Sequence, residues 1–266
     1  MVDILLTNDD GYLSSGFLPL LEELQKEFSV VAITPDTERS WIGKAISSKN
    51  LLQLKKTRLH DIEIYTINGT PADCVQIGLF HLLDSFPKMV ISGINQGVNV
   101  GHARILSSGT IGAAMEASIQ GIQALASSIM IPEDMKKTLD LFDEKNYSLF
   151  THAAQITAKL AFIMLDGVVD EDVDLFSVNC PFDATKESEI KITKPSKASY
   201  GNLFSEKDNG YILLPPLLEN DNMNIDSDMN ALFNGTISIT PLNLDLCLTH
   251  CLKNIEQRIT RSWKKR

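Results

Sequence analysis

The residues best suited to chemistry are two adjacent carboxylates, Asp9 and Asp10, which end a short apolar run near the N-terminus. The run Ile4–Thr7 predicts a buried parallel strand, and ligands bind in the crevice outside the carboxyl ends of such strands. Neighbouring carboxylates repel each other unless a positive charge lies between them, and a hard divalent cation supplies that charge. Because Asn-Asp-Asp-Gly is also a common turn sequence, these residues alone leave a metal site and a structural turn both open.

Two further predicted strand ends carry oxygen ligands that could join the aspartates. Ser40 follows the buried run Val30–Thr34, and Asn95 follows the buried run Lys88–Ser92. We expect these side chains and the Asp pair to share one rim of a parallel sheet. Two carboxylates, a hydroxyl and an amide oxygen form an all-oxygen set that suits Mg²⁺ or Mn²⁺ and not Zn²⁺. Water would complete the coordination shell and leave room for a phosphate oxygen and a nucleophilic hydroxide.

Two segments rich in small residues follow the third of these strands. Gly93–Gly101 contains three glycines and two asparagines, which indicates backbone that needs positive φ or a close approach to a ligand. Ser107–Glu116 predicts a helix N-terminus whose free N–H groups and hydroxyls suit a phosphate. The other interpretation is a close contact between helix and sheet through Gly112, Ala113 and Ala114, and both can hold together.

A regular alternation of strands and helices is needed to position these segments. Within the first 36 residues the order is strand, helix, strand, which indicates a right-handed βαβ unit on a parallel sheet and therefore an α/β fold. Thr70, Pro71 and Asp73 predict a capped helix start. The remaining strands and helices that we expect cover 62–67, 70–83, 124–131, 150–165, 175–179, 236–240 and 248–263.

The alternation fades in the last third of the chain. We expect 1–185 to form the catalytic core and 186–266 a C-terminal extension with a hairpin and a terminal helix. Apolar segments such as 212–214 persist there and need a surface to cover, and another subunit is a natural one. The charged segment 132–145 predicts an exposed connection, and the acidic segment 219–228 predicts a solvated loop.

The net charge and composition of the chain limit the kinds of binding partner that we expect. The net charge of −10 argues against binding to a nucleic-acid duplex, and an acidic protein that handles an anionic substrate needs a cation to offset the repulsion. The N-terminus carries no signal-peptide pattern and no apolar run approaches the roughly 20 residues that span a bilayer, so we expect no membrane partner. The four cysteines lack metal-ligand spacing, which favours reduced thiols and a cytoplasmic location.

Six segments carry motifs that occur together, in the same order and at similar spacing, in one known family. They are Thr7–Gly11, Ala32–Asp36 with Arg39 and Ser40, Gly69–Cys74, Ser92–Gly101, Ser108–Glu116 and Ser238–Leu242. With these motifs the chain resembles the SurE family of stationary-phase survival proteins, which are metal-dependent 5'/3'-nucleotidases. The resemblance covers nearly the whole chain, and several ordered motifs are far more specific than any one of them.

The resemblance implies a Rossmann-like core with a C-terminal extension used in dimer or tetramer assembly. It implies hydrolysis of nucleoside 5'-monophosphates, and of 3'-monophosphates, by a metal-activated water with one Mg²⁺ or Mn²⁺ per subunit. The family's metal ligands fall on Asp9, Asp10, Ser40 and Asn95, of which Asp9, Asp10 and Asn95 are the expected catalytic residues. The residues that surround the phosphate in the family fall on Asn99, Ser108, Gly109 and Thr110.

The sequence departs from the family at two places. Trp41 and Ile42 follow Ser40 where many members have small residues, which can reshape the pocket. The segment Gly101–Arg104 lacks the acidic pair often found after that glycine. Arg104 could aid an anion there, although a surface arginine is the interpretation that we favour. These differences affect the choice of nucleotide and not the metal chemistry.

Two alternatives come from other functional classes. A receiver-like phospho-signalling module also holds Mg²⁺ with an acidic pair, but it needs an aspartate where Asn95 stands and a lysine soon after 124–131. A non-catalytic nucleotide-binding protein is the second alternative. Turnover of p-nitrophenyl phosphate with Mn²⁺ separates it from an enzyme.

Overall fold

The computed structural model describes residues 1–214 and 224–263. Its centre is a nine-stranded sheet in the order β3-β4-β2-β1-β5-β6-β7-β11-β8, and β9 and β10 form a separate hairpin. The strands are β1 Ile4–Thr7, β2 Val30–Pro35, β3 Leu54–Leu59, β4 Ile62–Ile67, β5 Met89–Asn95, β6 Gln123–Ile129, β7 Leu175–Cys180, β8 Ile190–Ile192, β9 Phe204–Lys207, β10 Gly210–Leu213 and β11 Ile237–Leu242. The six strands from β4 to β7 in this order are parallel, which confirms the predicted α/β fold with a mostly parallel sheet.

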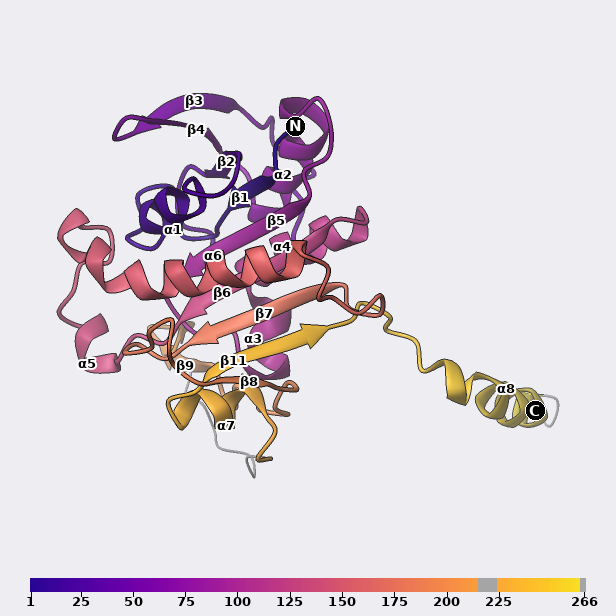
Figure 1. The fold of residues 1–266 in the computed structure, drawn as a ribbon. Coiled ribbons are helices and arrows are strands. Elements are labelled where there is room, and N and C mark those ends of the chain that lie inside the picture. The colour runs from indigo at the N-terminus through magenta and orange to yellow at the C-terminus, as the bar shows by residue number, and fades with distance from the viewer. Residues whose placement is uncertain (215–223, 264–266) are drawn as a thin grey trace.

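Helices cover both faces of this sheet (Figure 1). They are α1 Phe17–Leu24, α2 Pro71–Ile77, α3 Gly101–Ser107, α4 Gly109–Ile119, α5 Glu133–Lys136, α6 Thr151–Leu165, α7 Asp228–Phe233 and α8 Leu252–Trp263, with short helical turns at Gly78–Leu82 (η1), Glu144–Phe150 (η2) and Thr249–Cys251 (η3). Along β1, Ile4 and Leu6 pack under α1 and α6, whereas Leu5 packs under α2 and α4. The strand reads as a continuous apolar run because both of its faces are buried.

The expected capped helix is present at Thr70. The Thr70 hydroxyl accepts from the Asp73 N–H at 3.1 Å, and the Asp73 carboxylate accepts from the Thr70 N–H at 2.8 Å. With Pro71 in the first turn, this reciprocal pair stabilises the start of α2. The helix then continues into η1, a π-helical turn, so the predicted helix 70–83 consists of two helical pieces.

The C-terminal part of the chain returns to the main sheet. Strand β11 pairs antiparallel with β7, and β8 pairs parallel with β11. The predicted hairpin is formed by β9 and β10. Part of the acidic segment that we expected to be a solvated loop, 219–223, lies outside the described residues, but its last residue, Asp228, is only 1% exposed and begins α7. The domain boundary near residue 185 stays a prediction.

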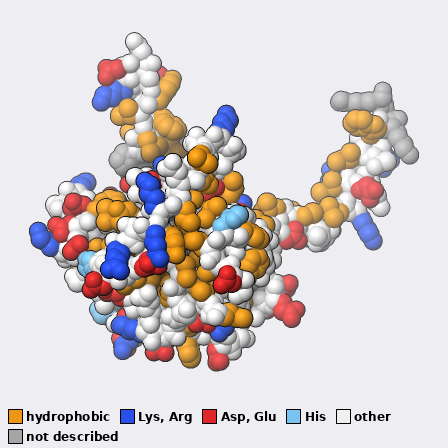
Figure 2. Space-filling view, turned by 90° about the horizontal axis from the view of Figure 1, so that it is seen from above, with side chains coloured by type: hydrophobic (Ala, Val, Ile, Leu, Met, Phe, Trp, Pro, Cys, Tyr) orange, Lys and Arg blue, Asp and Glu red, His pale blue; other side chains and the backbone are white. Residues whose placement is uncertain are grey.

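Helix α8 stands clear of the rest of the molecule (Figures 1 and 2). It contains no buried residue, and its apolar side chains are all exposed to solvent in the single chain. They include Leu252, Ile255, Ile259 and Trp263. An isolated helix of this length is marginal in water, so its apolar face needs a partner surface.

Residues Glu144–Leu165 form the one helical stretch among the described residues that is long and apolar enough in composition to cross a membrane. In the fold, α6 packs against α1 and the sheet, with Ala154, Ile156 and Ala161 in the core. Its apolar composition is therefore explained by burial inside the protein.

Candidate metal centre

The predicted metal ligands lie at the carboxyl ends of three neighbouring strands. Asp9 and Asp10 follow β1, Ser40 lies in the loop after β2, and Asn95 ends β5. Because β1 lies between β2 and β5, the three strand ends meet on one rim. The structure brings all four side chains to the lining of a single pocket of about 290 Å³.

The two aspartates are buried negative charges. Asp9 is 4% and Asp10 is 7% exposed, and neither forms an ion pair with a lysine, arginine or histidine of the described residues. Burial raises the pKa of Asp9 to about 6. Burial and the neighbouring charge of Asp9 raise the pKa of Asp10 well above its usual range. A buried carboxylate pair without a cationic partner fits a divalent cation, which would favour the ionised forms of both groups.

The turn that carries the aspartates is built by their neighbours. The buried Asn8 side chain donates to the Gly11 carbonyl at 2.8 Å and to the Ser14 hydroxyl at 3.0 Å. Its own Oδ1 accepts from the Gly11 N–H at 3.2 Å. Gly11 has φ 85, a conformation that glycine adopts without strain. The turn and the metal site are therefore not exclusive, because Asn8 and Gly11 make the turn while Asp9 and Asp10 line the pocket.

The other two predicted ligands, Ser40 and Asn95, have oxygens available at the rim. The Ser40 hydroxyl donates to Glu38 Oε1 at 2.5 Å. Asn95 donates through its Nδ2 to the Gly97 carbonyl at 2.7 Å, which leaves the amide oxygen as its potential ligand atom. Glu38 also lines the pocket, and its charge helps to raise the pKa of both aspartates. The sequence analysis missed this third carboxylate, although it lies in the same loop as Ser40.

The donor set is made of hard oxygen atoms. No group of three or more histidine, cysteine, aspartate or glutamate side chains within 1–214 and 224–263 is arranged to hold a metal ion. Beside the carboxylates, the hydroxyl of Ser40 and the amide of Asn95 offer further oxygen donors to a metal ion on this rim. Such a set fits Mg²⁺ or Mn²⁺ better than Zn²⁺.

Helix α4 begins directly against the aspartates. Ser108 is its N-cap and accepts from the Ile111 N–H at 3.1 Å. A Cβ on Gly109 would lie 2.8 Å from the Asp9 Cβ, so only glycine allows this approach. Thr110 is fully buried, and its hydroxyl donates to Asp9 Oδ1 at 2.6 Å. The structure thus places the Thr110 side chain on Asp9, a predicted metal ligand, and not in the lining of the pocket, whereas Ser108 does line it.

Asn99 is held by a polar network inside the sheet. Its N–H donates to Asn179 Oδ1 at 2.8 Å, and its Nδ2 donates to the Ser128 hydroxyl at 2.9 Å. Asn99 also lines the pocket. One Nδ2 hydrogen and the side-chain oxygen of Asn99 therefore remain for a substrate.

Arg104 lies in the pocket lining and is half-buried, which differs from the surface position that we favoured from sequence. It is the one lysine or arginine among the described residues that line this pocket, and its Nε has no hydrogen-bond partner there. Burial lowers the pKa of its guanidinium. The arginine therefore adds a positive charge, without an ion pair among the described residues, to a pocket whose other charged lining residues are carboxylates.

The segment 132–145 is more than an exposed connection. The Leu141 carbonyl accepts from the Ser15 N–H at 2.8 Å and from Gln96 Nε2 at 2.8 Å. Phe142 reaches the lining of the pocket. The segment is charged because much of it faces solvent, but its second half closes one side of the site.

A buried ion pair fixes the loop that carries Ser40. The Lys44 ammonium pairs with the Glu116 carboxylate on α4, and Gln76 Nε2 from α2 donates to Glu116 Oε1 at 2.5 Å. The Gly43 N–H also donates to the Ser107 carbonyl at 2.8 Å. The loop after β2 is therefore attached to the helix whose N-terminus faces the aspartates.

Comparisons with known proteins show the family to which the chain belongs. The family model described as survival protein SurE matches residues 4–202. A protein named 5'-nucleotidase SurE from Methanocaldococcus jannaschii is 36% identical over 267 residues, and one of the same name from Methanococcus vannielii is 37% identical over 266 residues; each alignment covers 96% of both chains. The crystal structure of the SurE protein from Aquifex aeolicus matches with a TM-score of 0.77 and 31% identity, over 96% of this chain and 98% of that chain.

The matched region contains the three strand ends that carry Asp9, Ser40 and Asn95. The relatives extend the similarity over nearly the full length, and the shared architecture confirms the resemblance inferred from the motifs. This chain belongs to the SurE family of survival proteins.

Proposed function

We propose that this protein is a divalent-metal-dependent 5'-nucleotidase that hydrolyses nucleoside 5'-monophosphates, and also 3'-monophosphates, to nucleoside and phosphate. The observation that carries the proposal is the buried Asp9 and Asp10 pair, which has no cationic partner among the described residues and faces a pocket at the carboxyl rim of the sheet. Relatives named 5'-nucleotidase SurE support the activity. Family membership disfavours the receiver-like module and the non-catalytic nucleotide-binding protein as alternatives.

Asp9, Asp10, Ser40 and Asn95 would hold one Mg²⁺ or Mn²⁺ per subunit. When bound, such an ion offsets charge on the phosphoryl oxygens and lowers the pKa of water. Asp9 is oriented for this by the Thr110 hydroxyl, and Asp10 by the Gln96 N–H at 3.1 Å. Partners of this kind fix a ligand's orientation and commonly affect metal affinity.

The substrate phosphate would lie between the start of α4 and Arg104. The first N–H groups of α4 have no partner within the helix and, together with the Ser108 hydroxyl, favour an anion. The Arg104 guanidinium offers fixed positive charge to the same group. No histidine or cysteine lines the pocket among the described residues, and we assign the two aspartates to the cation, so we favour direct attack of water on phosphorus over a covalent enzyme intermediate.

Substitution of Ser108 tests the phosphate position. We expect Ser108→Ala to raise KM or to lower kcat by about tenfold, because a hydrogen bond to a charged group is lost, while metal affinity stays nearly intact. The matched control is Ser227→Ala, which removes the same kind of N-cap from α7, where Ser227 accepts from the Asn230 N–H. Both variants lose helix-cap stability, and only Ser108→Ala should change nucleotidase kinetics. Unchanged kinetics in Ser108→Ala would make the turn merely structural.

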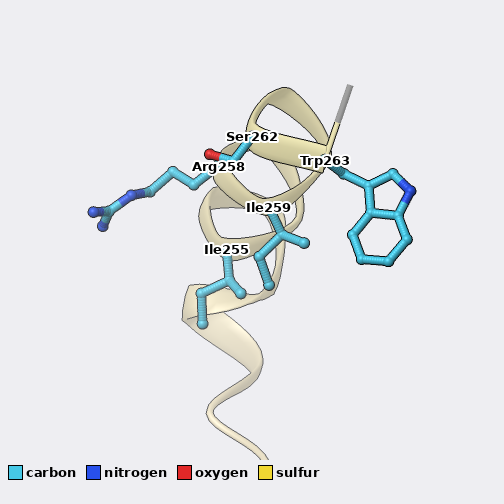
Figure 3. Close-up of a pocket in the computed structure, with 5 residues that line it drawn as sticks. All are labelled: Ile255, Arg258, Ile259, Ser262 and Trp263. Carbon is cyan, nitrogen blue, oxygen red and sulfur yellow. The ribbon is translucent and has the colours of Figure 1, made fainter. Parts of the chain in front are cut away.

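A homo-oligomer, dimer or tetramer, is the assembly that we propose, formed through the C-terminal extension. A hollow of about 910 Å³ lies beside α8, and its described lining comes from that helix alone. Figure 3 shows Ile255 and Ile259 along this helix, with Trp263 near its end. Apolar side chains that stand clear of the chain's own core gain stability when another subunit covers them.

Light scattering checks the assembly. We expect the intact protein to be a dimer or a tetramer at micromolar concentration, and Ile259→Asp to shift it toward monomer because a charge is then buried at the contact. Lys253→Ala on the same helix is the control and should leave the mass unchanged. A strictly monomeric wild-type protein would contradict this proposal.

The cytoplasm is the compartment that we propose. All four cysteines are free thiols, two of them buried, as is usual for proteins kept in a reducing environment.

A further inference from the structure

Two aromatic residues line the pocket from elements other than the strand that precedes the aspartates. They are Trp41, in the loop after β2, and Tyr200, in the segment after β8, and we call this pair the aromatic wall. The two ring centroids lie 5.0 Å apart with an interplanar angle of 50°. Both residues line the pocket that contains Asp9 and Asp10, and the Trp41 residue is 43% exposed.

Hydrogen bonds connect the aromatic wall to Ser107, at the end of α3. The Tyr200 hydroxyl hydrogen-bonds to the Ser107 hydroxyl at 2.5 Å. The loop that carries Trp41 is attached to the same residue through the bond from the Gly43 N–H to the Ser107 carbonyl. Ser107 directly precedes Ser108, the N-cap of α4. The wall is therefore held at a fixed place beside the position proposed for the phosphate.

The backbone of Trp41 is unusual. Its φ is 61, a left-handed conformation that few residues other than glycine adopt. Such a conformation persists only where the surrounding structure imposes it, and it is common at ligand sites. In this protein it holds a large, half-exposed indole on the rim of a polar pocket instead of in the core, where burial would stabilise the fold more.

We propose that Trp41, supported by Tyr200, stacks against the nucleobase of the substrate and makes this enzyme select nucleotides over phosphomonoesters that lack a base. This inference rests on the proposed nucleotidase function and deepens it. Apart from Val98 and Phe142, the rest of the pocket lining consists mainly of charged and polar residues that suit a phosphate and a cation, and neither of these ligands needs an aromatic surface. A nucleobase does, since every base has a π-face that stacks on aromatic side chains. The pocket of about 290 Å³ is of the size of small ligand sites.

Kinetics with matched substrates test the stacking. We expect Trp41→Ala to raise KM for adenosine 5'-monophosphate about tenfold more than KM for ribose 5-phosphate, a difference of about 1.4 kcal/mol. Trp41→Phe keeps an aromatic face and should recover most of the loss. Phe142→Ala is the control, because Phe142 is an exposed aromatic residue that lines the same pocket from the segment 132–145. Equal rises of KM for the two substrates in Trp41→Ala would overturn the inference, and so would a base-dependent loss in Phe142→Ala alone.

Fluorescence provides a readout that does not require turnover. The chain has two tryptophans, so Trp263→Phe leaves Trp41 as the only one. We expect adenosine 5'-monophosphate and adenosine to quench the emission of this variant in a saturable way, and ribose 5-phosphate to leave it nearly unchanged. Quenching without any hydrolysis would support the stacking and contradict the nucleotidase function. Hydrolysis of adenosine 5'-monophosphate with no response of Trp41 at saturating concentration would contradict the stacking alone.

Discussion

Asp9→Asn is expected to lower kcat by about a thousandfold or more and to weaken Mn²⁺ binding, while the fold survives. The substitution keeps the shape of the side chain and its contact with the Thr110 hydroxyl but removes one of the two buried charges that attract the cation. Loss of groups that merely orient a metal ligand costs about 10- to 100-fold, so loss of a charged ligand should cost more. Steady-state release of phosphate from adenosine 5'-monophosphate with added Mn²⁺ measures the effect.

The control for this variant is Asp3→Asn, a half-buried aspartate whose carboxylate pairs with Lys88 away from the pocket. Its kinetics should match those of the wild type. A fully active Asp9→Asn enzyme would show that the Asp pair is only a turn.

The metal-free protein is expected to lose stability as pH rises from about 4 to about 7. Burial raises the pKa of Asp9 from 3.8 to about 6 in the folded state, and the pKa of Asp10 is raised in the same direction. Between the unfolded and folded pKa values the folded protein binds more protons than the unfolded chain, so the free energy of unfolding falls with pH. For Asp9 the shift corresponds to about 3 kcal/mol at pH 7.

Asp9→Asn should therefore stabilise the metal-free protein at neutral pH by about 3 kcal/mol and leave it nearly unchanged below pH 4. Urea unfolding in EDTA at several pH values measures the difference between wild type and variant. Asp3→Asn should instead lower the free energy of unfolding at neutral pH, because Lys88 and the Ser29 N–H lower the pKa of Asp3 in the folded state. A variant that is less stable than wild type at pH 7 in EDTA would contradict the account. Added Mn²⁺ should raise the free energy of unfolding of the wild type by about 2.7 kcal/mol when its concentration is a hundred times the Kd of the site.

The positions of the metal ligands could be predicted because they depend on local sequence. Each of Asp9, Ser40 and Asn95 follows a short apolar strand, and the topology of parallel strands then places their ends together. The capped start of α2 was predictable for the same reason, since Thr70 and Asp73 are three residues apart. In such cases the interactions lie within a few residues of each other along the chain.

The residues that complete the pocket could not be predicted because they depend on contacts that are distant in sequence. Tyr200 reaches Ser107 from 93 positions along the chain. Thr110 was expected beside the phosphate, but its hydroxyl instead donates to Asp9, 101 positions away. Arg104 is charged and lies on a short helix, so its sequence favoured the surface, but the packing of α3 directs it into the pocket lining. No periodicity or motif carries that information.

The burial of Asp228 in the C-terminal segment could not be predicted, for the same reason. Asp228 belongs to an acidic run that predicts a solvated loop, yet its carboxylate accepts from the Gly101 N–H at 2.7 Å and from the Ser196 N–H at 2.9 Å. These bonds attach α7 and the segment before Tyr200 to the start of α3. The sequence predicts that a charged residue in a polar run faces solvent, because it does not show which distant backbone N–H groups bond to that residue in the fold.

The most direct test of the metal centre is phosphate release by the wild-type protein after treatment with EDTA and again after titration with Mn²⁺. The account predicts no activity in EDTA, full recovery with one Mn²⁺ per chain and no recovery in Asp9→Asn. Full activity of the wild type in EDTA would contradict it.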